Sequence, residues 1–174
     1  MYAHPFDPFG LTELPFGLPG RIFRSPMPFR FADYNGKLFQ AYLREGISVV
    51  VVLAEAEECQ QRTGRDLLAF YRLQGLEVIH CPISDFSVPE QGPMRLALET
   101  VAEKALAGKH AVVHCYAGFG RTGTFMACLA HRLLGMNGET AIKWVRTHIP
   151  SALESEAQVQ FVQEYAGRSM LDER

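Results

Sequence analysis

A chain of 174 residues, 48% hydrophobic and 21% charged, has the size and balance of one globular domain with a full core. Its net charge of −2 excludes a general attraction to nucleic acid or anionic membranes, so any affinity for phosphate must be local. The apolar runs are too short to cross a bilayer and the N-terminus lacks the order of a signal peptide, so we expect a cytoplasmic protein.

The first third of the chain contains an arm, a short strand and a helix. Residues 1–20 are rich in Pro, Phe and Gly, and we interpret them as an extended arm without regular structure that packs on the domain. Residues 21–23 are compatible with a short edge strand, and residues 37–44 have helical spacing. The β-branched run 47–53 is apolar on both faces, which is typical of a strand in the middle of a parallel sheet.

The remainder of the chain alternates between strands and helices. An acidic stretch at Glu55, Glu57 and Glu58 follows the first buried strand. The patterns then predict helices at 66–73, 94–107, 125–134, 138–148 and 154–165, strands at 77–81 and 110–114, and a surface loop at 83–89. This alternation indicates an α/β domain with a mostly parallel sheet and a ligand at the carboxyl ends of its strands.

The segment from His114 to Thr124 is the most informative in the chain. It lies between an apolar strand and an apolar-periodic helix, and it contains Gly118, Gly120 and Gly123. In such a turn the backbone N–H groups and the start of the helix attract an anion, and Arg121 adds a planar fork that matches two phosphate oxygens. A thiol at Cys115 inside this cradle is surrounded by groups that favour the thiolate.

The spacing of cysteine and arginine is not sufficient by itself, because Cys59 and Arg65 have the same spacing. Cys59 follows three glutamates that disfavour a thiolate, and only one glycine separates it from Arg65. We therefore interpret that second pair as a coincidence. The four cysteines, Cys59, Cys81, Cys115 and Cys128, show no CxxC spacing, which favours free thiols over a structural zinc site. No cofactor or metal is expected.

The sequence His114-Cys115-x5-Arg121-Thr122-Gly123 resembles the active-site loop of the cysteine-dependent protein tyrosine phosphatase superfamily. The form Gly-Phe-Gly-Arg-Thr-Gly-Thr, with Ile83-Ser84-Asp85-Phe86 upstream, is most similar to the small atypical dual-specificity phosphatases. The resemblance covers roughly residues 20–166 and implies a single α/β domain with a central sheet of four or five mostly parallel strands flanked by helices. We place the catalytic domain at 21–168, after the arm and before a tail at 169–174.

Each chemical role has a candidate residue. Cys115 is the expected nucleophile, which forms a phosphocysteine intermediate. Arg121 clamps the phosphate together with the backbone N–H groups of the loop. Asp85 is the expected general acid and then base, and Thr122 could donate a hydrogen bond to the departing sulfur. The phosphate-binding loop consists of Tyr116, Ala117, Gly118, Phe119, Gly120 and Arg121.

Two further residues have weaker claims. His114 more readily orients the loop than moves protons, as the family resemblance also implies. Gln158 resembles a family glutamine that positions the attacking water, although an exposed helix residue explains it equally well.

Cys59 or Cys81 could trap oxidised Cys115 as a disulfide, but spacing does not place them nearby.

The loop also bears on the substrate. It contains no lysine, which favours a single phosphate on an otherwise uncharged group. The expected substrate is therefore a phosphoprotein or phosphopeptide, through phosphotyrosine and also phosphoserine or phosphothreonine. Two alternatives stay open: the same chemistry on a phosphoinositide, an RNA 5′-phosphate or a small metabolite, and a phosphate-binding module without turnover. The absence of a basic stripe counts against nucleic acid, and the sequence does not indicate an oligomeric state.

Overall fold

The computed structural model describes residues 6–172, with side chains described up to residue 168. A five-stranded sheet with the order β1-β2-β5-β3-β4 forms its centre. The strands are β1 (Thr12–Leu14), β2 (Ile22–Ser25), β3 (Ile47–Val52), β4 (Glu77–His80) and β5 (His110–His114). All neighbouring strands are parallel except β1, which pairs with β2 in the antiparallel direction. The predicted mostly parallel α/β sheet is confirmed.

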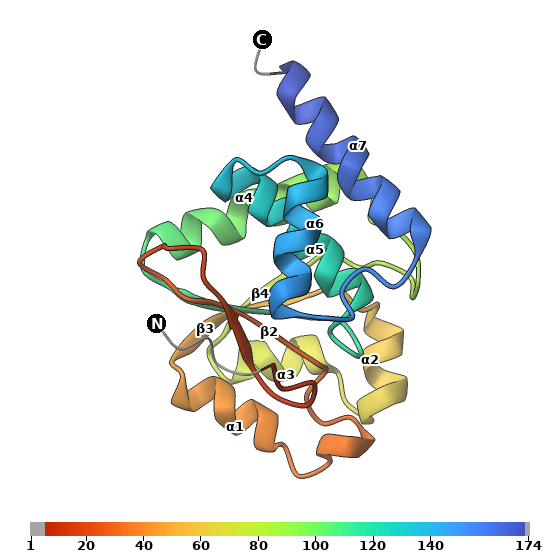
Figure 1. Cartoon of the computed structure of the whole chain (residues 1–174). Coiled ribbons are helices and arrows are strands. Elements are labelled where there is room, and N and C mark those ends of the chain that lie inside the picture. The colour runs from red at the N-terminus through yellow and green to blue at the C-terminus, as the bar shows by residue number, and fades with distance from the viewer. Residues whose placement is uncertain (1–5, 173–174) are drawn as a thin grey trace.

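Helices cover both faces of this sheet (Figure 1). One layer contains α4 (Gln91–Leu106), α5 (Gly120–Leu134), α6 (Gly138–His148) and α7 (Glu156–Asp172). The opposite layer contains α1 (Lys37–Arg44), α2 (Ala56–Thr63) and α3 (Leu67–Leu73), preceded by the short 3-10 helix η1 (Phe31–Asp33). Alternate residues of the central strands enter two separate cores: Val51 and Val113 face α4 and α5, whereas Val50 and Val112 face α1 and α3.

Two sequence-based expectations about these elements are wrong. The arm is not free of regular structure, because Thr12–Leu14 forms β1 between its prolines. The strand near residue 22 is not an edge strand, because β1 covers one side of it and β5 pairs with the other. No element was predicted for the acidic stretch after β3. It is helical, because α2 begins at Ala56 with Glu57 and Glu58 in its first turn, where carboxylates complement the helix dipole.

Helix boundaries shift where the ends carry polar or small residues. Helix α5 begins at Gly120, five residues before its apolar pattern, so Arg121 and Thr122 lie in its first turn. Helix α7 continues to Asp172, past the predicted end of the catalytic domain. Within the described residues, no helix is long and apolar enough to span a membrane.

The central position of β5 places the loop that follows it. Backbone N–H of Leu53, just after β3, donates to the carbonyl of His114 at the end of β5 (2.9 Å). The segments that leave β2, β3 and β5 at their carboxyl ends therefore meet at one edge of the sheet.

Candidate active site

The loop between β5 and α5 is folded around the sulfur of Cys115, which is buried. Backbone N–H of Gly118 donates to Sγ (3.3 Å), and the hydroxyl of Thr122 donates to it as well (3.2 Å). Both bonds are stronger with a thiolate than with a thiol, because sulfur is a weak acceptor when neutral. The loop therefore presents one sulfur atom whose neighbours favour negative charge.

Arg121 lies beside this sulfur with a side chain only 1% exposed. Its Nη1 and Nη2 donate to the two carboxylate oxygens of Glu58 (2.7 and 2.8 Å), and Nη1 also donates to the carbonyl of Ile83 (2.9 Å). Burial opposes the charge, but the bonds to Glu58 and the attraction of Cys115 raise the pKa of the guanidinium above its ordinary value. Its Nε is buried without a hydrogen-bond partner among the described residues, so a donor is free for an anion.

Glu58 is a site residue that the sequence reasoning missed. The glutamates after β3 were weighed only for their effect on Cys59, yet Glu58 fixes the plane of the Arg121 fork. The available signal was its position: an acidic residue just past the carboxyl end of a buried parallel strand, where the ligand of such a sheet is expected.

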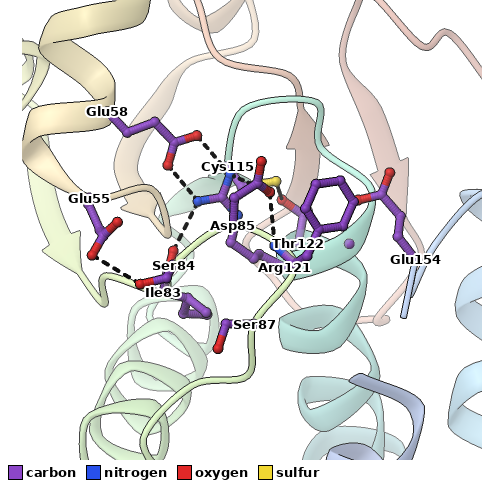
Figure 2. A network of polar contacts seen from close by, with 12 residues as sticks. Glu55, Glu58, Ile83, Ser84, Asp85, Ser87, Cys115, Arg121, Thr122 and Glu154 are labelled. Carbon is purple, nitrogen blue, oxygen red and sulfur yellow. Dashed lines mark hydrogen bonds and ion pairs between the residues drawn. The ribbon is translucent and has the colours of Figure 1, made fainter. Parts of the chain in front are cut away.

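Asp85 approaches from a different loop, between β4 and α4. Its Oδ1 is 3.2 Å from Nη2 of Arg121, and its side chain is 44% exposed (Figure 2). The backbone N–H of Phe86 donates to the same oxygen (3.0 Å), with Phe86 itself in the left-handed region at φ 58°. The carboxyl thus faces both the buried cationic fork and solvent, which is the position that a proton donor to a bound group requires.

The start of α7 holds the loop of Asp85. Nε2 of Gln158 donates to the carbonyl of Ser87 (3.3 Å), and Oγ of Ser155 donates to the carbonyl of Phe86 (3.3 Å). Oε1 of Gln158 accepts from the backbone N–H groups of Glu154 and Ser155, so its amide is fixed at both ends. Gln158 is fully buried, and the alternative that it is an exposed helix residue is wrong.

Glu154 brings a second carboxyl to the same site (Figure 2). Burial and the charge of Asp85 raise its pKa above the ordinary range, while a hydrogen bond from the backbone of Gly120 works in the opposite direction. The sequence reasoning did not single out this residue, because it took Glu154 as the first residue of the helix predicted at 154–165, whereas α7 begins at Glu156.

His114 supports the loop from below and is fully buried. A carbonyl can only accept, so Nδ1 donates to the carbonyl of Cys115 (2.9 Å), and Nε2 accepts from the hydroxyl of Tyr71 (2.8 Å). Burial lowers the pKa of the imidazole to about 4, so the ring is neutral at pH 7. This geometry agrees with an orienting residue and places no proton of His114 on the sulfur.

Arg24, on β2, is a second buried arginine that the sequence reasoning missed. Its Nε and Nη2 donate to the carbonyls of Gly118 and Ala117 (both 3.0 Å), and Nη1 donates to the carbonyl of Asp7 in the N-terminal arm (3.0 Å). Its guanidinium carbon lies 5.1 Å from the ring centre of Phe6 and 5.2 Å from that of Phe119. Burial lowers its pKa to about 10, which still leaves it charged at pH 7. Arg24 therefore joins the arm to the phosphate loop.

Two glycines of the loop are required by close contacts. Gly118 has φ +80°, and a Cβ there would lie 2.5 Å from both Nη2 of Arg24 and the carbonyl oxygen of Ser25. A Cβ on Gly123 would lie 2.7 Å from Cβ of Ala152. The predicted need for close backbone approach is confirmed at both positions.

The other cysteines lack these neighbours. Burial, and then the charge of Glu58, raise the pKa of Cys59 to about 11. Burial together with Glu90 raises that of Cys81 to about 11. Cys59, Cys81, Cys115 and Cys128 are all free and buried. A disulfide with oxidised Cys115 stays an untested prediction.

A parallel α/β sheet with a cysteine, an arginine and a helix start at its carboxyl edge defines the class of the cysteine-dependent phosphatases. Residues 32–133, more than half of the chain, match the Tc-R-P family, described as "Polymorphic toxin system, DSP-PTPase phosphatase". The chain belongs to this family.

The chain is also similar to individual relatives and solved structures. An uncharacterized protein of Methanocaldococcus jannaschii is 36% identical over 92 residues, which are 52% of this chain and 60% of the relative. The chain thus spans less than two thirds of that relative's length. The crystal structure of a mutant form of Tk-PTP is 29% identical with a TM-score of 0.73, and the similarity covers 87% of this chain and 93% of the other.

Two further solved structures are similar in fold. Kinase associated phosphatase, with its catalytic-site cysteine replaced by serine, has a TM-score of 0.82 at 21% identity, over 96% of this chain and 97% of the other. PTPMT1 in complex with PI(5)P has a TM-score of 0.72 at 15% identity, over 98% of each chain. At these identities the two structures establish the fold alone, which is the predicted phosphatase fold.

Proposed function

We propose that the protein hydrolyses phosphomonoesters through a phosphocysteine intermediate, and that its substrates are phosphotyrosine and also phosphoserine or phosphothreonine in proteins. One observation carries the proposal: the sulfur of Cys115, the unpartnered Nε of Arg121 and the carboxyl of Asp85 converge from two loops on one point. A module that only binds phosphate has no use for a proton donor at that point, and this argues against the non-catalytic alternative.

In the first step the Cys115 thiolate attacks phosphorus and a sulfur–phosphorus bond forms. The bond between phosphorus and the leaving oxygen breaks, and that oxygen takes a proton from Asp85. Arg121 and the loop N–H groups stabilise the charge on the equatorial oxygens. The incoming phosphate competes with Asp85 for Nη2 of Arg121, which frees the carboxyl to turn toward the leaving group.

In the second step a water molecule attacks phosphorus while the Asp85 carboxylate takes its proton. The phosphorus–sulfur bond breaks, and inorganic phosphate and the thiolate are released. The hydroxyl of Thr122 donates to the departing sulfur, as it already does at 3.2 Å. The fixed amide of Gln158 holds the loop of Asp85 through both steps.

The exposure of the rim favours a phosphate presented by a macromolecule. Asp85 is 44% exposed at the edge of the site, and Phe86 next to it is 62% exposed. A shallow site of this kind accepts an ester on a protein surface without enclosing the rest of the substrate. We therefore place phosphoproteins before phosphoinositides, RNA ends and small metabolites.

Hydrolysis of p-nitrophenyl phosphate tests the chemistry, and a panel tests the substrate. The panel contains phosphotyrosine and phosphoserine peptides, PI(5)P in mixed vesicles and an RNA 5′-phosphate at equal concentration. We expect turnover of the aryl phosphate to survive a metal chelator, and phosphotyrosine peptide to give the highest kcat/KM. Loss of activity with the chelator would overturn the cysteine mechanism, and a higher kcat/KM for any non-protein substrate would overturn the assignment to phosphoproteins.

A further inference from the structure

Two arginines outside the phosphate loop lie against its first side chain. The guanidinium carbon of Arg62 is 4.4 Å from the centre of the Tyr116 ring, and that of Arg30 is 5.7 Å from it. A third, Arg65, lies 4.2 Å from the ring of Phe29, the residue before Arg30. Cation–π contacts of this kind hold a guanidinium in place while leaving its N–H groups free to bind an anion.

Both arginines come from segments that are fixed to the catalytic site. Arg62 lies one helical turn after Glu58 on α2, so it shares the face that carries the bidentate pair with Arg121. Arg30 follows a segment anchored by the N–H of Met27, which donates to the carbonyl of Tyr116 (2.8 Å). Hydrogen bonds between these segments and the catalytic site therefore fix the positions of Arg30 and Arg62 relative to Cys115.

Their charges are not matched by carboxylates. Within the described residues, neither Arg30, Arg62 nor Arg65 has an acidic oxygen within 4 Å, whereas Arg21 and Arg132 elsewhere on the surface do. Nε of Arg30 is buried and has no hydrogen-bond partner among the residues that the structure describes. The acidic residues next to them in sequence are engaged with backbone: Asp33 accepts from the N–H groups of Phe29 and Leu38, and Asp66 accepts from that of Ala69.

We propose that Arg30 and Arg62 form a second anion subsite beside the phosphate loop, which binds an acidic group next to the scissile phosphate on a phosphopeptide. The inference rests on the proposed function and narrows its substrate class to peptides with an Asp, Glu or second phosphorylated residue close to the phosphotyrosine. A planar guanidinium pairs with either kind of anion through two parallel N–H bonds. This proposal differs from the expectation of a single phosphate on an uncharged group, which was drawn from the lack of lysine in the loop, and the experiment below decides between the two.

A peptide fits these observations better than a membrane. Clusters of about four to eight basic residues are needed to hold a protein at an anionic bilayer. The subsite offers two such residues, or three with Arg65, on a chain whose net charge is −2. Two arginines beside a catalytic loop are enough to bind one acidic or phosphorylated side chain of a peptide.

The test compares two phosphotyrosine peptides that differ only in their flanking residues, acidic in one and Asn or Gln in the other. Wild type should prefer the acidic peptide by roughly fivefold in kcat/KM, the upper range for exposed ion pairs. Arg62→Glu should abolish or invert this preference, and Arg30→Gln should reduce it. Arg72→Glu is the matched control, because Arg72 is an exposed arginine in the last turn of α3, which leads into the amino end of β4.

Hydrolysis of p-nitrophenyl phosphate by the same variants separates the subsite from the phosphate loop, because this substrate has no second anion. An equal loss on the aryl phosphate and the acidic peptide would make the arginines structural and overturn the proposal. A loss of activity on PI(5)P vesicles with an unchanged peptide preference would replace the peptide by a lipid headgroup. If the wild-type protein hydrolyses none of these substrates, the proposed function fails. Binding of the two peptides, labelled with fluorescein, then tests the anion subsite alone. Equal affinities for the acidic and the neutral peptide would overturn the subsite.

Discussion

The chain contains two cysteine–arginine pairs at the same spacing, and they differ in the backbone around the cysteine. Cys115 directly follows the buried strand β5, and its sulfur accepts hydrogen bonds from Gly118 and Thr122. Cys59 lies inside helix α2, where backbone N–H groups bond to carbonyls of the same helix, and burial raises its pKa to about 11. The comparison teaches that a reactive cysteine depends on unpaired backbone donors, which a loop provides and a helix interior does not.

The two pairs are also physically connected. Glu58, next to Cys59, disfavours a thiolate on that residue but holds the guanidinium of Arg121 for the other. Helix α2 therefore disfavours the thiolate of Cys59 and at the same time holds Arg121 at the site of Cys115. Four changes break or sharpen this contrast.

Replacing the sulfur in each pair by oxygen gives the largest expected difference. Cys115→Ser should reduce kcat on p-nitrophenyl phosphate by about 10⁴-fold or more, because a serine hydroxyl in this loop has no base to ionise it. Cys59→Ser should leave kcat within about twofold, with a stability cost of about 1 kcal/mol typical of a buried site. Steady-state kinetics and thermal unfolding measure the two effects, and appreciable turnover by Cys115→Ser would remove the nucleophile assignment.

The second change removes the proton donor and keeps the cysteine pair intact. Asp85→Asn should lower kcat on p-nitrophenyl phosphate by roughly 10² to 10⁴-fold, with loss of the basic limb of the pH–rate profile. Asp33→Asn is a useful comparison, since Asp33 accepts bonds from backbone N–H groups away from Arg121. A basic limb that persists in Asp85→Asn would assign the acid to another group, and Glu154 is the nearest candidate.

The contrast between the two cysteines also explains what the sequence could predict. The strand before Cys115, the glycines and the helix behind are local patterns, and they identified the loop, the sheet class and the loop of Asp85. These local patterns did not identify Arg24 or Glu58, because the two residues reach the loop from β2 and α2, 94 and 63 residues away in sequence. Only the position of Glu58 after a buried strand gave a signal, and it did not indicate Arg121 as the partner. The roles of Arg24 and Glu58 depend on which strands are neighbours, and periodicity does not reveal strand order.

Secondary structure failed for a related reason. Helix α2 was not predicted because its exposed acidic residues have little apolar periodicity, and its helical form depends on packing of Cys59 against the core. Strand β1 was missed because it is three residues long and lies between prolines. In both cases tertiary pairing outweighs a weak local signal.

The third change tests the buried charge behind the loop. Iodoacetamide should modify Cys115 well before Cys59 in wild type at pH 6.5. Arg24→Met removes a buried positive charge that attracts the Cys115 sulfur, together with four hydrogen bonds to carbonyls. Alkylation of Cys115 should therefore slow by roughly tenfold. Arg24→Lys keeps the charge and should recover part of the rate. Arg21→Met removes a half-buried arginine that is paired with Glu13 and Glu45 and should have no effect. Equal alkylation rates in Arg24→Met and Arg24→Lys would limit Arg24 to a structural role.

The fourth and smallest effect is the pH dependence of the free energy of unfolding that is due to His114, the residue that supports the phosphate loop. His114 has a pKa of about 4 in the folded chain, below its ordinary value of 6.5, because it is buried and neutral. Between these values the unfolded chain binds the extra proton, so the free energy of unfolding is complete above pH 6.5 and falls as pH drops toward 4, by at most about 3 kcal/mol. Urea unfolding at pH 7, 5.5 and 4 measures the fall, and His114→Gln should flatten it. If that variant does not fold, an NMR titration of wild type replaces it: an imidazole that protonates near pH 6.5 in the folded protein would contradict the neutral, loop-orienting histidine.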